Sequence, residues 1–198
     1  MTDWDRLLNI RTTGRDSTNA DSYRYPYEPT PYAVLERISD SGVIRRRHRV
    51  LDYGCGKGRA VIFLASVVGC RATGVDYSKK LIDLARENAR TSGKGDRTRF
   101  ICSLAEQYVP ADEDVFFFFN PFSARVFGAV LRRLEASWLA RPREMRVCCY
   151  FPSDEYLAFL AAVPALKPLA EIDCRDLFGA KNPRERVVVY AFAAGEGK

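Results

Sequence analysis

"VLDYGCGKGRA", residues 50–60, decides the fold, because a short apolar strand turns there through closely spaced glycines into a helix. Gly54, Gly56 and Gly58 permit positive φ angles and let a ligand approach the backbone closely. Their GxGxG spacing differs from the GxxxxGK of a P-loop and from the GxGxxG of a dinucleotide fold. Asp52, two residues before the first glycine, would repel a diphosphate but attract an ammonium or sulfonium group.

A second acid, Asp76, ends the next apolar segment, 18 residues after Gly58. In doubly wound folds, an acid near this separation accepts hydrogen bonds from the two hydroxyls of a ribose. A ribose without a diphosphate, beside a glycine loop that carries an acid, indicates S-adenosylmethionine as the ligand.

Strand and helix patterns alternate along the rest of the chain. Strands are expected at 49–53, 71–77, 98–103, 114–119, 145–151, 169–178 and 184–192. Helices are expected at 59–69, 78–93, 123–139 and 153–163, after an earlier helix with Thr30 as its N-cap. The alternation predicts an α/β fold, a Rossmann-like doubly wound sheet that is mostly parallel. The last two strands, with no helix between them, predict an antiparallel hairpin at one edge.

The composition suits a globular protein of one domain. The 198 residues carry a net charge of +6, which permits a nucleic-acid partner without requiring one. We expect a single domain over 1–198, with an N-terminal arm and helix at 1–43 and a catalytic core at 44–198. No apolar stretch approaches the roughly 20 residues of a membrane span, and no signal peptide is evident, so we expect a cytoplasmic protein without a membrane partner. Six cysteines without a CxxC pair and one histidine predict no metal site. Either a monomer or a dimer is compatible with the sequence.

The segments "VLDYGCGKGR" and "GVDYS" resemble the first two motifs of the class I (seven-strand) S-adenosylmethionine-dependent methyltransferases. The resemblance extends in element order over about residues 30–192. It implies the strand order 3-2-1-4-5-7-6 with strand 7 antiparallel, S-adenosylmethionine as cofactor and S-adenosylhomocysteine as product. The cofactor-binding residues that it implies are Asp52, Gly54, Cys55, Gly56, Gly58, Asp76, Tyr77, Ser103, Leu104 and Asn120.

The resemblance also implies roles for several of these residues. The three glycines would lie under the methionine part of the cofactor, and Asp52 would order the loop or meet the amino group. Asp76 would bind the ribose and Tyr77 would pack on the adenine. The family often has an aspartate after the third strand that accepts from the adenine amino group. Ser103 stands there instead, which leaves its hydroxyl, the Leu104 backbone or Glu106 as alternatives.

Asn120-Pro121-Phe122 follow the apolar run "DVFFFF" at 114–119. They resemble the Asn/Asp-Pro-Pro-Tyr/Phe motif of methyltransferases that act on amino groups, without the second proline. In that motif the amide oxygen and a nearby carbonyl accept from the target amine, and the aromatic ring packs on the substrate. The resemblance therefore implies catalytic roles for Asn120, Pro121 and Phe122. The alternative is that Asn120 only turns the chain or caps the next helix.

The arm before the first helix holds several tyrosines among prolines, and Pro29-Thr30 resembles a step found in some seven-strand protein-lysine methyltransferases. Tyr25, Tyr27 and Thr30 are therefore candidates for a lid that contacts substrate; alternatively, the tyrosines pack on the flank of the core. The expected acceptor is an amine of a protein lysine or a small molecule. An RNA or DNA N-methyltransferase and a non-catalytic S-adenosylmethionine-binding protein are the alternatives.

Overall fold

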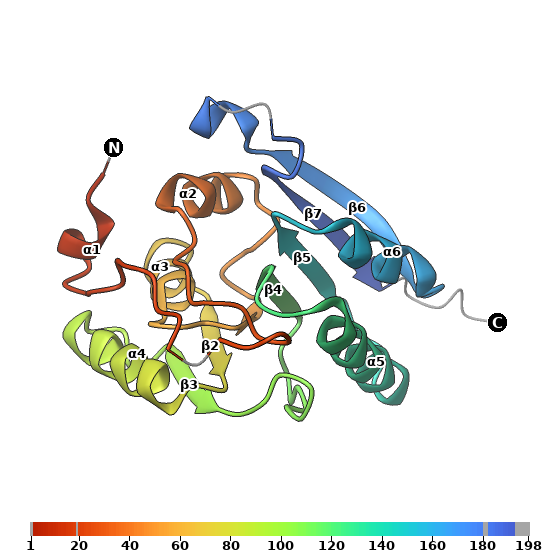
Figure 1. The fold of residues 1–198 in the computed structure, drawn as a ribbon, viewed down its shortest axis with the longest axis horizontal. Coiled ribbons are helices and arrows are strands. Elements are labelled where there is room, and N and C mark those ends of the chain that lie inside the picture. The colour runs from red at the N-terminus through yellow and green to blue at the C-terminus, as the bar shows by residue number, and fades with distance from the viewer. Residues whose placement is uncertain (1, 19, 180–181, 193–198) are drawn as a thin grey trace.

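The computed structural model describes residues 2–18, 20–179 and 182–192, which are built around a seven-stranded sheet (Figure 1). The strands are β1 (Arg49–Tyr53), β2 (Arg71–Asp76), β3 (Thr98–Cys102), β4 (Val115–Phe119), β5 (Arg146–Tyr150), β6 (Leu166–Asp173) and β7 (Arg186–Phe192). Their order is β3-β2-β1-β4-β5-β7-β6, and β7 is antiparallel to both of its neighbours. The other neighbouring pairs are parallel. The predicted fold class and strand order are confirmed.

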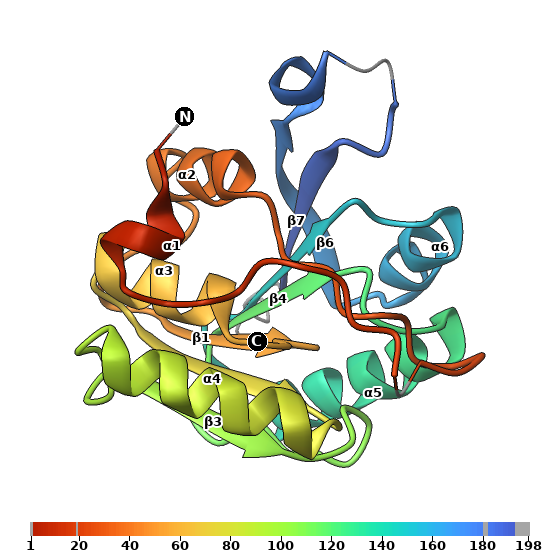
Figure 2. The ribbon, with the colours of Figure 1, turned by 60° about the vertical axis from the view of Figure 1, so that its left-hand side comes forward.

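Helices cover both faces of the sheet (Figure 2). They are α1 (Trp4–Leu7), α2 (Tyr32–Asp40), α3 (Arg59–Val67), α4 (Lys79–Thr91), α5 (Ala124–Ala140) and α6 (Asp154–Ala162). α2, α3 and α4 share one apolar cluster with the sheet, whereas α5 and α6 share the other. None of the helices in the described ranges is both long and apolar enough to cross a membrane.

The phenylalanine run of β4 is explained by its central position between these two layers. Phe117 packs into the cluster of α2, α3 and α4, and Phe116 and Phe118 pack into the cluster of α5 and α6. All three side chains are buried, and burying each contributes about 2 kcal/mol. Phe119, at the carboxyl end of the strand, is only partly buried. The apolar run therefore ends where the sheet opens.

Two predicted boundaries were wrong. Thr30 is not the N-cap of α2; Pro31 occupies that position, and the Thr30 carbonyl instead accepts a hydrogen bond from Arg59. The strand expected at 169–178 begins earlier, at Leu166, and ends at Asp173. The Asp173 carboxylate accepts hydrogen bonds from the backbone N–H and guanidinium of Arg175, which starts a 3-10 helix at Arg175–Phe178.

Candidate functional site

A cavity of about 710 Å³ lies at the carboxyl ends of the parallel strands and is bordered on one side by the N-terminal arm. Its volume is in the range of small-molecule sites, about 300–1,000 Å³. The residues singled out in the sequence that border it are Tyr25, Tyr27, Pro29, Thr30, Asp52, Gly54, Cys55, Asp76, Tyr77, Ser103, Glu106, Asn120, Pro121 and Phe122. Gly56, Gly58 and Leu104 do not border it.

The glycine loop is packed tightly between the arm and the end of β4. Gly54, Gly56 and Gly58 have φ angles of 76°, 52° and 85°, in the left-handed region that glycine adopts without strain. A Cβ added at Gly56 would lie 2.0 Å from the Tyr27 ring, and one added at Gly54 would lie 2.4 Å from Cβ of Pro121. The loop therefore needs glycine both for its backbone conformation and for its close neighbours.

Asp76 connects the end of β2 to this loop. Its Oδ2 accepts from the Gly56 N–H at 3.0 Å, and its Oδ1 accepts from the Ser78 N–H at 2.9 Å. Burial raises the pKa of this carboxyl group, and backbone hydrogen bonds from Ser78, Gly56 and Tyr77 oppose that shift. A carboxylate has about four acceptor positions, so acceptor capacity remains on the side of the cavity that Asp76 borders.

Asp52 is a buried carboxyl group on the cavity wall, with an exposed fraction of 5%. Among the described residues, none donates a hydrogen bond to its side chain. Burial, followed by the charge of Asp76, raises the pKa of Asp52 to about 8. A cationic group in the cavity would favour the ionised form of this acid. The residues present thus fit a ligand with an ammonium or sulfonium group beside the glycine loop.

The raised pKa of Asp52 predicts a pH-dependent stability. The folded state holds the proton more tightly than the unfolded state, so the free energy of unfolding should fall as pH rises toward 8. Burial lowers the pKa of His48 to about 4, so this residue raises the free energy of unfolding as pH rises. Its effect ends near the ordinary histidine pKa of about 6.5. Between pH 6.5 and 8 we expect a loss of about 1.5 kcal/mol in the ligand-free protein.

Urea denaturation at these two pH values measures the effect, with Asp52→Asn as the matched variant. Asparagine has nearly the same shape and no proton to lose in this range. The variant should lose little stability over the interval. Equal losses in both proteins would show that Asp52 does not titrate as described.

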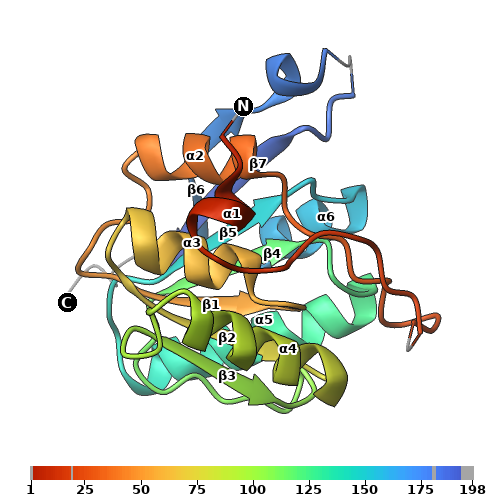
Figure 3. The ribbon, with the colours of Figure 1, turned by 90° about the vertical axis from the view of Figure 1, so that its left-hand side faces the viewer.

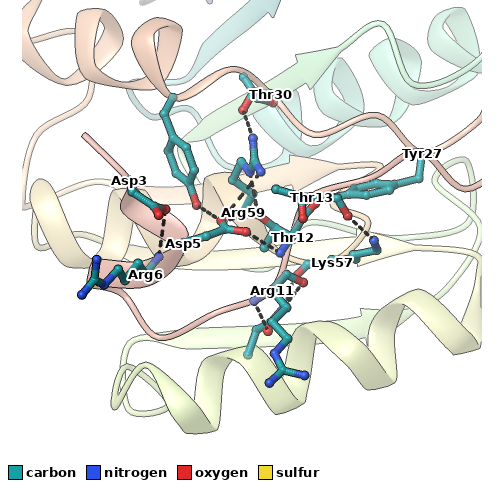
Figure 4. A network of polar contacts seen from close by, with 12 residues as sticks. Asp3, Asp5, Arg6, Arg11, Thr12, Thr13, Tyr27, Thr30, Lys57 and Arg59 are labelled. Atoms are coloured by element: carbon teal, nitrogen blue, oxygen red, sulfur yellow. Dashed lines mark hydrogen bonds and ion pairs between the residues drawn. The ribbon is translucent and has the colours of Figure 1, made fainter. Parts of the chain in front are cut away.

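A buried polar network holds the arm to the start of α3 (Figure 4). Nε of Arg59 donates to Oγ1 of Thr12 at 2.6 Å, and its Nη1 donates to the Thr30 carbonyl at 3.3 Å. Nη2 lies 3.7 Å from Oδ1 of Asp5, and the guanidinium lies 4.3 Å from the centroid of the Tyr32 ring. One residue beside the glycine loop thereby contacts several separate points of the arm.

The arm continues from this network across the carboxyl ends of the strands (Figure 3). The Tyr27 hydroxyl donates to the Thr12 carbonyl at 2.6 Å, which fixes its ring against Gly56. Farther along, the Tyr25 N–H donates to the Pro121 carbonyl, and the Ser123 N–H donates to the Tyr23 carbonyl. The arm thus pairs with the Asn120–Phe122 segment through backbone hydrogen bonds. Tyr27 packs on the core flank, whereas a lid function of the arm stays a prediction.

Asn120 has a φ angle of 39°, which is uncommon for a residue other than glycine. Asparagine tolerates this conformation better than most residues, so Asn120 does turn the chain as β4 ends. Asn120 also borders the cavity, and no described residue hydrogen-bonds to its side-chain amide. The two interpretations of this residue are therefore compatible, and its role toward an acceptor stays a prediction.

The side of the cavity at Tyr77 contains a cation that the sequence did not indicate. The Arg24 guanidinium lies 5.3 Å from the centroid of the Tyr77 ring and forms an ion pair of 3.2 Å with Glu106. Ser103 donates its backbone N–H to the Asp76 carbonyl. No local pattern marks Arg24, because the arm reaches Tyr77 only in the folded chain.

The sequence also did not indicate several other residues of the cavity wall, among them Glu28, Phe119, Tyr150, Phe151 and Glu185. Tyr150 ends β5, the parallel neighbour of β4, so the rule that ligands bind beyond strand carboxyl ends would have found Tyr150 and Phe151. Glu185 directly precedes β7, and because β7 is antiparallel its start lies at the same edge. In the described ranges, no group of three or more His, Cys, Asp or Glu side chains is arranged to hold a metal ion.

Residues 50–136 match the sequence model of a family described as a methyltransferase domain. Over this segment and in its seven-stranded sheet, the chain resembles the methyltransferases. Methyltransferase GfsG of Streptomyces halstedii is 28% identical over 106 residues, which are 48% of this chain and 38% of the relative. The chain thus spans well under half of that relative's length.

Solved structures of methyltransferases share the fold. An RNA methyltransferase from Salinibacter ruber in complex with S-adenosyl-L-homocysteine has a TM-score of 0.59 and 18% identity, covering 86% of this chain and 96% of that one. An S-adenosylmethionine-dependent methyltransferase from Thiobacillus denitrificans, also with S-adenosyl-L-homocysteine, has a TM-score of 0.58 and 16% identity, covering 98% and 99%. At these identities the likeness shows the fold of the methyltransferase domain.

Proposed function

We propose that the protein is an S-adenosylmethionine-dependent methyltransferase that methylates an amine nitrogen, with residues 1–198 acting as one domain and the arm at 1–43 closing the cavity. The observation that carries the proposal is the close contact between Pro121 and Gly54. A Cβ added at Gly54 would lie only 2.4 Å from Cβ of Pro121. This contact places the Asn120–Phe122 segment directly against the glycine loop. A cofactor on the loop and an acceptor at Asn120 would then be neighbours in one cavity.

The cofactor would be held by residues from three strand ends. Asp52 supplies for a cationic group a carboxyl group that pairs with no described residue, and it borders the cavity beside the glycine loop. Asp76 supplies acceptors for ribose hydroxyls, while Tyr77 and Ser103 border the same side of the cavity. The solved neighbours bind S-adenosyl-L-homocysteine on this fold, which supports the assignment.

The chain's own part in the reaction is binding and orientation. When bound, S-adenosylmethionine supplies a methyl group to the nitrogen lone pair, the electrons of the broken C–S bond stay on sulfur, and a proton leaves the nitrogen for water. The Asn120 amide oxygen would accept a hydrogen bond from the amine and so direct its lone pair. Correct orientation of two reactants supplies much of such an acceleration.

An RNA acceptor is the second candidate, favoured by the net charge of +6 and by the solved neighbour described as an RNA methyltransferase. The charge balance of the cavity does not favour a phosphate-bearing acceptor. Its charged side chains are the acids Asp16, Glu28, Asp52, Asp76, Glu106 and Glu185 and the cations Arg15, Arg24 and Arg59. Acids outnumber cations in the cavity although the chain as a whole is basic.

Two measurements test the proposal. Calorimetry should detect S-adenosylmethionine binding that Asp76→Ala weakens at least about tenfold, or 1.4 kcal/mol. Asp40→Ala, an exposed acid outside the cavity, should leave it unchanged. Equal binding by the Asp76 variant and wild type would refute the cofactor site.

Transfer is then followed in cell lysate with a radiolabelled methyl group, and the products are digested with protease or nuclease. Label that is lost with nuclease but survives protease would favour the RNA candidate. Label released as a small or protein-bound methylamine would support an amine acceptor.

A further inference from the structure

The side of the cavity formed by the ends of β4 and β5 is an aromatic recess, which consists of Glu28, Phe119, Tyr150, Phe151 and Glu185. The centroid of the Tyr150 ring lies 4.7 Å from that of Phe119 and 6.1 Å from that of Phe151. Phe119 and Tyr150 are register partners in neighbouring parallel strands. The walls of the recess are therefore anchored in the sheet.

Two carboxylates, those of Glu28 and Glu185, border the aromatic recess. Oε2 of Glu185 accepts from the Tyr150 hydroxyl at 2.6 Å. Burial, the hydrogen bond to Glu185 and, as the smallest of the causes, the charge of Glu28 raise the pKa of Tyr150. Among the described residues, no lysine or arginine forms an ion pair with Glu28 or Glu185.

The other solvent-facing acids of the cavity are neutralised by the chain itself. Asp16 pairs with Lys80 at 2.8 Å, and Glu106 pairs with Arg24 at 3.2 Å. Asp52 has an exposed fraction of only 5% and borders the same cavity. No described residue donates a hydrogen bond to it or forms an ion pair with it. Asp76 is also buried and borders the cavity without an ion pair to a described residue. Glu28 and Glu185 are thus the solvent-facing acids of the cavity that no described cation neutralises.

Arg184 and Arg186 flank Glu185 in sequence, and neither forms an ion pair with it; Arg186 instead pairs with Glu171 at 3.1 Å. The Arg184 guanidinium lies 4.2 Å from the centroid of the Phe151 ring and donates to the carbonyls of Phe151 and Pro152, both at 3.1 Å. It therefore supports the wall without forming an ion pair with the neighbouring carboxylate.

Aromatic faces together with unpaired carboxylates are the chemistry that binds an ammonium group. We propose that the aromatic recess binds an ammonium group of the acceptor, separate from the nitrogen that is methylated, so that the acceptor is an aliphatic diamine or polyamine. This inference rests on the proposed amine methylation for the identity of the second nitrogen. The reacting nitrogen has to be neutral at transfer, so a charge held by Glu28 and Glu185 belongs to another group of the same molecule.

Calorimetry with 1,5-diaminopentane and pentylamine tests the inference in the presence of saturating S-adenosyl-L-homocysteine. The two probes have the same carbon chain and differ by one ammonium group. We expect the diamine to bind at least about tenfold more tightly, because its second ammonium group gains ion pairs in a partly buried site. In the double variant Glu28→Gln and Glu185→Gln this preference should disappear, whereas Glu87→Gln, an exposed acid outside the cavity, should retain it.

The outcomes separate the two proposals. Equal binding of the two probes by the wild type, or a preference that survives in the double variant, overturns the proposal that the aromatic recess binds an ammonium group. Melting curves show whether the double variant is folded. Tyr150→Phe is a second variant, which keeps the ring but loses the hydrogen bond to Glu185. It should weaken the preference for the diamine. If the diamine binds as expected but no label is transferred to it, the recess stands and the amine methylation fails.

Discussion

Asn120→Gly is expected to lower the rate of methyl transfer about 100-fold while leaving the melting temperature unchanged. Glycine adopts the observed φ angle of 39° without strain, so the turn after β4 is kept and only the amide is lost. The loss should appear in kcat because the amide is proposed to orient the acceptor, not to hold the cofactor. The measurement is transfer of a radiolabelled methyl group under saturating cofactor.

Asn120→Asp is the matched control for this variant. Aspartate also tolerates the left-handed conformation and keeps a side-chain oxygen that can accept from an amine. It should therefore retain more activity than the glycine variant. Full activity of Asn120→Gly would mean that Asn120 only turns the chain.

Gly56→Ala is expected to weaken S-adenosylmethionine binding about 100-fold, or 2.7 kcal/mol, although Gly56 itself does not border the cavity. The new Cβ would lie 2.0 Å from Cδ2 of Tyr27, so either the ring or the loop has to move. Movement of the loop removes the Gly56 N–H from Asp76, and movement of the ring displaces the arm. Calorimetry gives the affinity, and urea denaturation gives the stability.

Gly42→Ala separates the clash from simple backbone strain. Gly42 also has a positive φ angle, 70°, but a Cβ there would meet nothing within 4 Å. It should cost about 1 kcal/mol of stability and no affinity. Adding Tyr27→Ala to Gly56→Ala should recover part of the lost affinity by making room. If Gly42→Ala and Gly56→Ala have the same effect on S-adenosylmethionine affinity, the contact with Tyr27 does not contribute to cofactor binding.

The sheet could be predicted from the sequence because its causes are local or nearly so. The glycine loop, the acids at the ends of β1 and β2, and the alternation of strands and helices all lie in contiguous segments. The run Phe116–Phe118 required a strand covered on both faces, and the central position of β4 supplies those two faces.

The arm could not be predicted in the same way. Arg59 contacts Thr12, Thr30 and Asp5, which are 29 or more residues away in the chain. Such contacts leave no periodic signal, and the competition of Arg59 for the Thr30 carbonyl also explains part of the misplaced helix start. The left-handed turn at Asn120 was one of two alternatives, and only the backbone conformation shows that it is present.

The aromatic recess is built from residues 28, 119, 150, 151 and 185, and all but one of them lie outside the segment 50–136 that matches the methyltransferase family. The part of the chain that similarity detects contains most of the residues proposed to bind the cofactor. Residues that would distinguish one acceptor from another can thus diverge without changing that similarity. Two proteins with the same match over 50–136 need not share a substrate, and comparing them at Glu28, Tyr150 and Glu185 is the sharper criterion for grouping them by function.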